Sequence, residues 1–364
     1  MAVSAHLITT LKTLATVAVG GAAGWAAYEG GLPLPWMMGP MLAVGLVGIL
    51  GIERNGHGVY VPYWLRTAMV PVIGVMLGSG FTPEVVAGMR EWWITLSALV
   101  VFILLCSALT YQFYRRVYRF DPATAYFSSI PGGLIDMAII GEGQGGDSRT
   151  ISLIHFSRIL VSVICLPFLM RHIYTATGPT SLTAGESVPM EIVDVVLLGG
   201  CAVVGYFGGL LIRLPGAQIS GPLALSAILH ATQTTVASPP VWLIVVAQIV
   251  VGSGLGARFA GVSLRAAGRL MIAAIFATVI MFSVTLVTAF AMSRFVDEPL
   301  AALILAYAPG GVTEMSLIAL SLNIGVAFIT SHHIARIALS IGIMPFLWRQ
   351  VVSKRVAGDQ PAGE

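Results

Sequence analysis

The chain has 364 residues, of which 57% are hydrophobic and only 10% are charged, with a net charge of +3. Soluble domains average roughly 45–50% apolar and 25% charged residues, so this composition excludes a soluble enzyme or DNA-binding module. It predicts an all-α polytopic membrane protein. We therefore expect the lipid bilayer as a partner, no nucleic acid and no enzymatic activity.

Apolar stretches long enough to cross a bilayer recur along the chain, and their order in the first half returns in the second. In the first stretch of the first half, Gly20 and Gly24 match Gly205 and Gly209 of the second half. This GxxxG spacing lets two helix backbones approach closely. Such faces could serve contacts within one chain or between chains, so we leave a homo-oligomer open.

The fourth apolar stretch of each half is the longest uninterrupted one. It covers residues 92–113 in the first half and 270–292 in the second, and it carries no acidic or basic side chain. A helix that is apolar all round is buried or faces lipid. We therefore expect two scaffold or lipid-facing helices here.

A short sequence that breaks a helix occurs twice. It is Pro131-Gly132-Gly133 in the first half and Pro309-Gly310-Gly311 in the second, a shift of 178 residues (309 − 131). Proline lacks the N–H that a helix needs, and glycine has no side chain to pack. Non-helical backbone at membrane depth is tolerated where it is buried in protein or lines a wet cavity. We therefore expect a broken or re-entrant element in each half, with a solute site beside it.

An acidic residue follows each break, Asp136 in the first copy and Glu314 in the second. Each carboxylate could bind Na⁺ together with freed carbonyls, or exchange a proton. Alternatively, each is an acidic cap that stabilises the N-terminal end of the helix after the break and touches no solute. Ser129 and Thr313 lie in the same segments, and their hydroxyls could contact solute or cap the backbone.

The last apolar stretch of each half carries a histidine three residues before an arginine, His155 with Arg158 and His333 with Arg336. This spacing puts both side chains on one helix face, which His332 also overlaps. A buried arginine in a membrane needs a partner or water. The arginines could pair with the two acids and lock the repeats together, or bind an anionic solute through the guanidinium fork. The histidines could relay protons or simply form hydrogen bonds.

The charges of the loops predict how the two halves face each other. After the fourth stretch, the first half has Arg115, Arg116 and Arg119, whereas the second has Arg294 offset by Asp297 and Glu298. After the third stretch, by contrast, the second half carries the excess of arginines and the first half does not. Under the positive-inside rule, equivalent loops then lie on opposite faces, which predicts two inverted-topology repeats.

Inversion requires an odd number of crossings in each half. Each half has six apolar stretches, and these make five crossings if the Pro-Gly-Gly element enters and leaves by the same face. The whole chain then has about ten transmembrane helices plus two broken or re-entrant segments. We expect both termini in the cytoplasm and the protein in the bacterial inner membrane. The predicted divisions are membrane repeat 1 at residues 1–175, a linker at 176–189, membrane repeat 2 at 190–350 and a cytoplasmic tail at 351–364.

The duplicated pattern resembles the AbrB family of bacterial integral membrane proteins along the whole chain. The residues that carry the resemblance are Pro131, Gly132, Gly133, Asp136, Met137, His155 and Arg158, and again Pro309, Gly310, Gly311, Glu314, Met315, His333 and Arg336. The resemblance implies an internal duplication. Family members carry labels that name regulators or ammonia monooxygenases. Since Asp136 stands where the second copy has Glu314, the two sites need not be equivalent.

We expect a secondary transporter of a small solute, with a weak preference for an organic anion. Its site would lie at the membrane midplane, where the two broken elements cross. The chain has no nucleotide-binding motif, so a gradient of H⁺ or Na⁺ would drive it without another cofactor. One alternative is a membrane sensor that regulates gene expression through a partner. A remote one is an intramembrane metal-dependent oxidase, although no close ligand motif is present.

Overall fold

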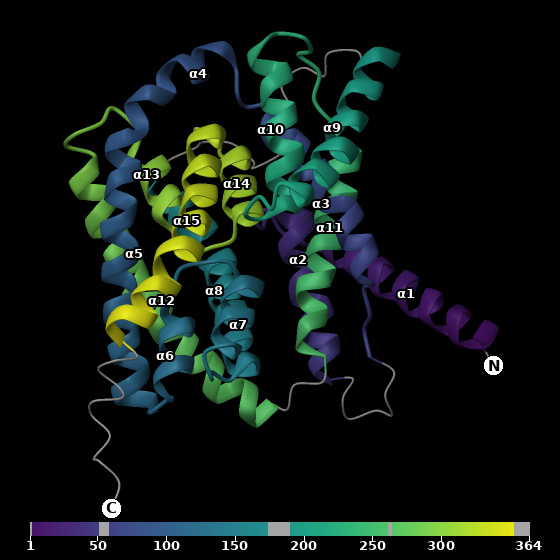
Figure 1. The fold of residues 1–364 in the computed structure, drawn as a ribbon. Helices are drawn as coiled ribbons and strands as arrows, with labels where there is room; N and C mark the ends of the chain where they lie inside the picture. Colours follow the sequence, from purple (N-terminus) through teal and green to yellow (C-terminus); the bar gives the residue numbers. More distant parts are fainter. Residues whose placement is uncertain (1, 51–57, 174–189, 261–263, 353–364) are drawn as a thin grey trace, which may run out of the picture. The chain divides into compact units, whose positions relative to one another are not determined.

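The computed structural model describes residues 2–50, 58–173, 190–260 and 264–352, and every regular element in these ranges is a helix (Figure 1). Five of these helices are long and apolar enough to cross a membrane: Pro83–Tyr118, Ser148–Met170, Ile192–Leu211, Gly268–Met292 and Val326–Gln350. The prediction of a helical membrane protein is therefore confirmed. The predicted linker, and the predicted tail from residue 353 onward, lie outside the described residues.

The chain forms two compact units, and each unit takes segments from both halves of the sequence. Unit 1 comprises Met1–Gly88, Pro167–Ala266 and Ser316–Ala327, and unit 2 comprises Met89–Leu166, Ala267–Met315 and Phe328–Glu364. The compact units therefore do not coincide with the two predicted repeats. All the residues that the sequence marks as site candidates fall in unit 2.

In unit 1, the second helix of each half packs between two others. The α-helices that lie entirely in this unit are α1 (Ala2–Glu29), α2 (Pro35–Leu50), α3 (Tyr63–Gly78), α4 (Pro83–Gly88), α9 (Ile192–Leu211), α10 (Ala217–Ala231) and α11 (Val241–Gly256). Helix α2 packs against α1 and α11, and α10 packs against α9 and α3. The second helix of each half thus packs on the first helix of its own half and on the third helix of the other half.

The predicted GxxxG contacts are confirmed, and they join helices of the same chain. A Cβ added to Gly221 of α10 would collide with the carbonyl oxygen of Gly205 of α9, and one on Gly209 would lie 3.2 Å from the Cα of Gly221. A Cβ on Gly24 of α1 would lie 2.9 Å from the ring of Trp36 on α2. Glycine is required at these positions because backbone or bulky side-chain atoms occupy the space of a side chain.

Unit 2 holds the two breaks. Its helices are α5 (Trp93–Phe113), α6 (Pro122–Ser129), α7 (Leu134–Glu142), α12 (Leu264–Met292) and α13 (Leu300–Tyr307), with most of α8 (Ser148–Ile173) and α15 (Val326–Leu347) and the first turn of α14 (Val312–Ser321). Helices α13, α14 and α15 each begin 178 residues after α6, α7 and α8. The shift found in the sequence therefore also governs where the helices start.

Helices α5 and α12 run antiparallel in unit 2. Near the end of α5, the ring of Phe113 lies 6.4 Å from that of Phe276, and Tyr114 packs with Ala273 in a buried cluster. At the opposite end, the indole of Trp92, just before α5, forms a hydrogen bond with the side chain of Glu298, just after α12. The C-terminal end of α5 therefore lies beside the N-terminal half of α12, and the chain just after α12 returns to the start of α5.

Candidate functional site

Both Pro-Gly-Gly sequences interrupt a helix, as predicted. Helix α6 ends at Ser129 and α7 begins at Leu134, while α13 ends at Tyr307 and α14 begins at Val312. The two breaks have the same backbone hydrogen bond, because the first glycine of each donates its N–H to the carbonyl two residues earlier at 2.8 Å. The duplicated sequence thus folds into a duplicated local structure.

The first break is the turning point of a hairpin. The N–H of Asp147, beyond the end of α7, donates to Oγ1 of Thr124 at the start of α6, at 2.7 Å. Helices α6 and α7 also pack against each other. The chain therefore returns after the break to the end of unit 2 from which α6 started.

Each arginine holds the backbone of its own break. Arg158 of α8 is 3% exposed and donates to the carbonyl oxygens of Ile130, at 2.9 Å, and Gly132, at 3.3 Å. Arg336 of α15 is 1% exposed and donates to the equivalent carbonyls of Ala308 and Gly310.

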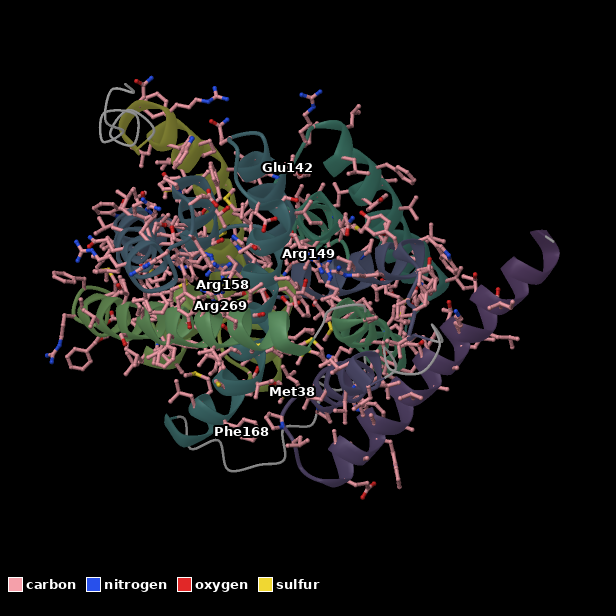
Figure 2. The ribbon with its side chains drawn as sticks, turned by 90° about the horizontal axis from the view of Figure 1, so that it is seen from below. Met38, Glu142, Arg149, Arg158, Phe168 and Arg269 are labelled. Atoms are coloured by element: carbon pink, nitrogen blue, oxygen red, sulfur yellow. The ribbon has the colours of Figure 1, made fainter. Side chains whose placement is uncertain are left out.

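Figure 2 shows Arg158 in the interior, among the side chains of the surrounding helices. The two guanidiniums thus satisfy carbonyls that a broken helix leaves without N–H partners. This role is neither of the two predicted ones, which were pairing with the acids and binding an anion.

The contacts of His155 fix its tautomer. Its Nε2 lies 2.8 Å from the carbonyl oxygen of Phe127, and its Nδ1 lies 3.1 Å from a guanidinium nitrogen of Arg158. A carbonyl accepts and a guanidinium donates, so Nε2 carries the hydrogen and Nδ1 the lone pair. In this arrangement His155 is neutral and positions Arg158, which agrees with the predicted alternative of simple hydrogen bonding.

His333 repeats half of this arrangement. Its Nε2 donates to the carbonyl of Leu305 at 2.9 Å, the position equivalent to Phe127. Its Nδ1 is buried and has no hydrogen-bond partner. The imidazole is therefore held by one contact where His155 has two, so the two halves of the site differ.

The two breaks meet inside unit 2. One turn after Arg158 on α8, the hydroxyl of Ser162 donates to the carbonyl of Pro309 in the second break, at 3.0 Å. The equivalent of Ser162 on α15 is Ser340, and a Cβ on Gly132 in the first break would lie 3.0 Å from its Cβ. Each of these two helices therefore binds its own break through an arginine and reaches the other break through a serine.

The acids lie in the first turn of the helix that follows each break. Asp136 is half-buried and Glu314 is 6% exposed. A Cβ on Gly133 would collide with the Asp136 carboxylate, and one on Gly311 would collide with that of Glu314. Each carboxylate therefore folds back over the glycine before its helix. This is the position that the acidic-cap alternative expects, and ion binding by these acids stays a prediction.

The two hydroxyl candidates differ in their surroundings. Ser129 is buried and its hydroxyl donates to the carbonyl of Tyr126 at 2.7 Å, within its own helix. Thr313 is half-buried at the second position of α14. Ser129 thus has the local backbone bond that one alternative predicted.

Several polar groups beside the breaks are buried without partners, and of these the sequence had marked Ser128 and the two arginines but not Ser340. The hydroxyls of Ser128 and Ser340 and the Nε atoms of Arg158 and Arg336 are buried without hydrogen-bond partners. The Cys106 thiol of α5 lies within electrostatic range of both guanidiniums. The signal for Ser340 was its alignment with Ser162 at the 178-residue shift. Among the described residues, no group of three His, Cys, Asp or Glu side chains is arranged to hold a metal ion.

Comparison with known proteins covers nearly the whole chain. A family model described as "Transition state regulatory protein AbrB" matches residues 36–352. A protein of Bacillus subtilis (strain 168) named "Uncharacterized protein YhjN" is 24% identical over 375 residues, which cover 93% of each chain. A protein of Escherichia coli (strain K12) named "Putative regulator AbrB" is 23% identical over 309 residues, which cover 84% of this chain and 86% of the relative.

Proposed function

The chain belongs to the AbrB family of helical membrane proteins, and from that premise we propose that it is a secondary transporter of a small organic anion. The proposed site lies where the two Pro-Gly-Gly breaks meet in unit 2. The observation that carries the proposal is that α8 binds both breaks, through Arg158 on the first and Ser162 on the second. Broken helices that meet inside a membrane bundle are the usual architecture of transporter sites.

The proposal includes two inverted repeats, with the breaks as re-entrant elements. Two observations support it. The equivalent helices α5 and α12 run antiparallel, as inversion requires, and the hairpin at Thr124 and Asp147 brings the chain back to the end where it started. The topology then has about ten crossings, with both termini in the cytoplasm and the protein in the inner membrane.

The charges and the hydrogen bonds favour an anion over a cation as solute. Two buried guanidiniums supply positive charge, and each has an Nε–H without a partner. A sodium site would need the carbonyl oxygens that the breaks release. Those of Ile130, Gly132, Ala308 and Gly310 already accept hydrogen bonds from the two arginines. We therefore propose H⁺ as the coupling ion and no metal or organic cofactor.

Uptake into proteoliposomes tests the proposal. The probes are labelled succinate and citrate, with labelled glycerol as the neutral control, under an imposed pH gradient and separately under a Na⁺ gradient. We expect uptake of one of the anions with the pH gradient, and its loss in the Asp136→Asn, Glu314→Gln double variant. Unimpaired uptake by the double variant would remove the acids from the mechanism, and wild-type vesicles that accumulate neither anion would contradict the proposal.

The second candidate is a membrane sensor that acts through a soluble partner. The observation that favours it is the name of the Escherichia coli relative, which describes a regulator. It predicts that a soluble protein co-purifies with the chain in a fixed ratio and dissociates when a ligand is added. A transporter that works alone predicts full uptake activity in vesicles that contain only the purified chain.

A further inference from the structure

A polar pair beside the second break has an apolar counterpart beside the first. His332 of α15 and Thr95 of α5 are both fully buried. At the 178-residue shift they correspond to Ile154 and Ala273, which are also fully buried and lie together in an apolar cluster. Burying polar groups costs free energy unless they are hydrogen-bonded. Since the apolar pair packs in the same structural position, folding alone does not require the polar one.

The hydrogen bonds of His332 allow it to hold either one or two protons. Its Nδ1 lies 2.8 Å from the carbonyl of Phe328 and therefore carries a hydrogen. Its Nε2 lies 2.8 Å from Oγ1 of Thr95, which in turn lies 2.9 Å from the carbonyl of Trp92. In neutral His332, the Thr95 hydroxyl donates to Nε2. When a proton adds to the Nε2 lone pair, that N–H donates to Thr95, and the hydroxyl hydrogen rotates to the Trp92 carbonyl.

Aromatic rings surround the His332 imidazole. Ring centroids lie 4.1 Å away for Phe328, 6.2 Å for Tyr307 and 6.3 Å for Trp92. The faces of aromatic rings attract a cation, which partly offsets the cost of its burial. The Tyr307 hydroxyl also donates to the backbone carbonyl of Thr95 at 2.6 Å, which fixes that residue.

Trp92 also contacts an acidic side chain. The Trp92 indole forms a hydrogen bond with the side chain of Glu298, in the loop before α13, and Glu91 is the next charged group. Burial raises the pKa of Glu298, and the negative charge of Glu91 raises it further, against the lowering effect of the Trp92 hydrogen bond. Glu298 is thus a carboxyl that takes up protons more readily than an exposed glutamate.

The helix that carries His332 also carries a positive charge nearby. Arg336 follows one turn later, and His333 is adjacent in sequence and interacts electrostatically with His332. Arg336 disfavours a second positive charge, whereas Glu298 and Glu91 beyond Trp92 favour one. The balance would change if an anionic solute bound beside Arg336, because the solute charge would offset that of the guanidinium.

We propose that His332 is a proton-binding site, which holds a proton while an anion occupies the site beside Arg336. In this respect the inference deepens the proposed transport function and rests on it. On uptake, an O–H bond of hydronium breaks as the Nε2–H bond forms, and release to water reverses both changes. The Thr95 hydroxyl only rotates, and its O–H bond stays intact. The site exists in the second half alone, because Ile154 cannot bind a proton.

The protonation of His332 can be measured directly, both without and with an anion. Purified protein labelled with ¹⁵N-histidine is titrated between about pH 3 and 8 by NMR, once alone and once with excess succinate, with the His332→Ile variant as the assignment control. Isoleucine is what the first half carries at this position, so the variant is expected to fold. We expect one ring signal to change with pH in the wild type and to be absent from the variant. Thr95→Ala should weaken the protonated signal at every pH tested.

The two proposals fail in different ways. If no pH-dependent histidine signal disappears in His332→Ile, the proton site is wrong, whatever the uptake assays show. If that signal titrates but vesicles accumulate no anion, the proton site stands and transport is wrong. If both hold, His332→Ile should abolish the stimulation of succinate or citrate uptake by a pH gradient.

Discussion

Ser162 of α8 donates a hydrogen bond to the backbone carbonyl of Pro309 at 3.0 Å, although the two residues lie 147 positions apart. One turn earlier on the same helix, Arg158 holds the carbonyl of Ile130. A single helix therefore fixes the distance between two interruptions that come from different halves of the sequence. The site consequently depends on both halves.

The Ser162 bond predicts a difference between two equivalent serines. Ser162→Ala removes a buried hydrogen bond and should lower the free energy of unfolding by about 1 kcal/mol. Ser340→Ala, at the matching position of α15, removes a hydroxyl that has no partner and should cost less. Thermal unfolding of the two purified variants in the same detergent compares them. Equal destabilisation would mean that the Ser162 bond contributes nothing.

The two hydrogen bonds of the Arg336 guanidinium predict that lysine cannot replace this arginine. Arg336 donates to the carbonyls of Ala308 and Gly310 through two different nitrogens, whereas lysine carries one ammonium group and cannot bridge both in the same way. Arg336→Lys should lower the unfolding temperature and abolish anion uptake. Arg149→Lys is the matched control, because Arg149 is exposed, and it should change neither quantity. A fully active Arg336→Lys protein would refute the need for a fork.

Part of this arrangement follows from the sequence, and part of it does not. The breaks at Pro131 and Pro309 are predictable, because proline and glycine cannot continue a helix. The partners of Arg158 and Arg336 were not predicted, because every residue has a carbonyl and the sequence does not mark the ones that a break releases. The sequence marked the two acids because charges are rare in apolar segments. It did not predict that each carboxylate folds over a glycine, because that position depends on the backbone geometry of the break.

The helix contacts of unit 1 predict opposite effects for two glycines. Gly221→Ala places a methyl group on the carbonyl of Gly205, so α9 and α10 must separate. We expect the free energy of unfolding to fall by about 1–3 kcal/mol, the usual cost of overpacking. Gly200→Ala on α9 meets nothing within 4 Å and should be neutral or stabilising by up to about 1 kcal/mol. Denaturation of both variants in one detergent measures this. A stable Gly221→Ala protein would contradict the close packing.

The cap of α8 predicts a stability that depends on pH. Asp147 accepts hydrogen bonds from the N–H of Arg149, at 3.1 Å, and the hydroxyl of Thr150, and the Thr150 bond is the main reason that its pKa is lowered. A lowered pKa in the folded state stabilises the protein above the ordinary aspartate pKa of about 3.9, and this contribution is lost as the pH falls below that value.

Asp147→Ala should therefore cost about 1 kcal/mol near neutral pH and less below about pH 4. Glu142→Ala, at the exposed end of α7, is the control and should show no such trend. Unfolding curves across this pH range test the prediction. A cost of Asp147→Ala that stays constant with pH would exclude the charged cap.

Cross-linking in the membrane tests most directly whether the two halves meet at the breaks. A Cβ on Gly132 would lie 3.0 Å from that of Ser340, close to the roughly 3.5–4.5 Å of a disulfide. Cys106, Cys165 and Cys201 are first replaced by alanine, and a protease site is inserted within residues 176–189. Gly132→Cys with Gly342→Cys serves as the control, since the space beside Gly342 is open. After oxidation and cleavage, we expect Gly132→Cys with Ser340→Cys to keep the two halves covalently joined while the control pair releases them; halves that separate equally in both would show that the breaks do not meet.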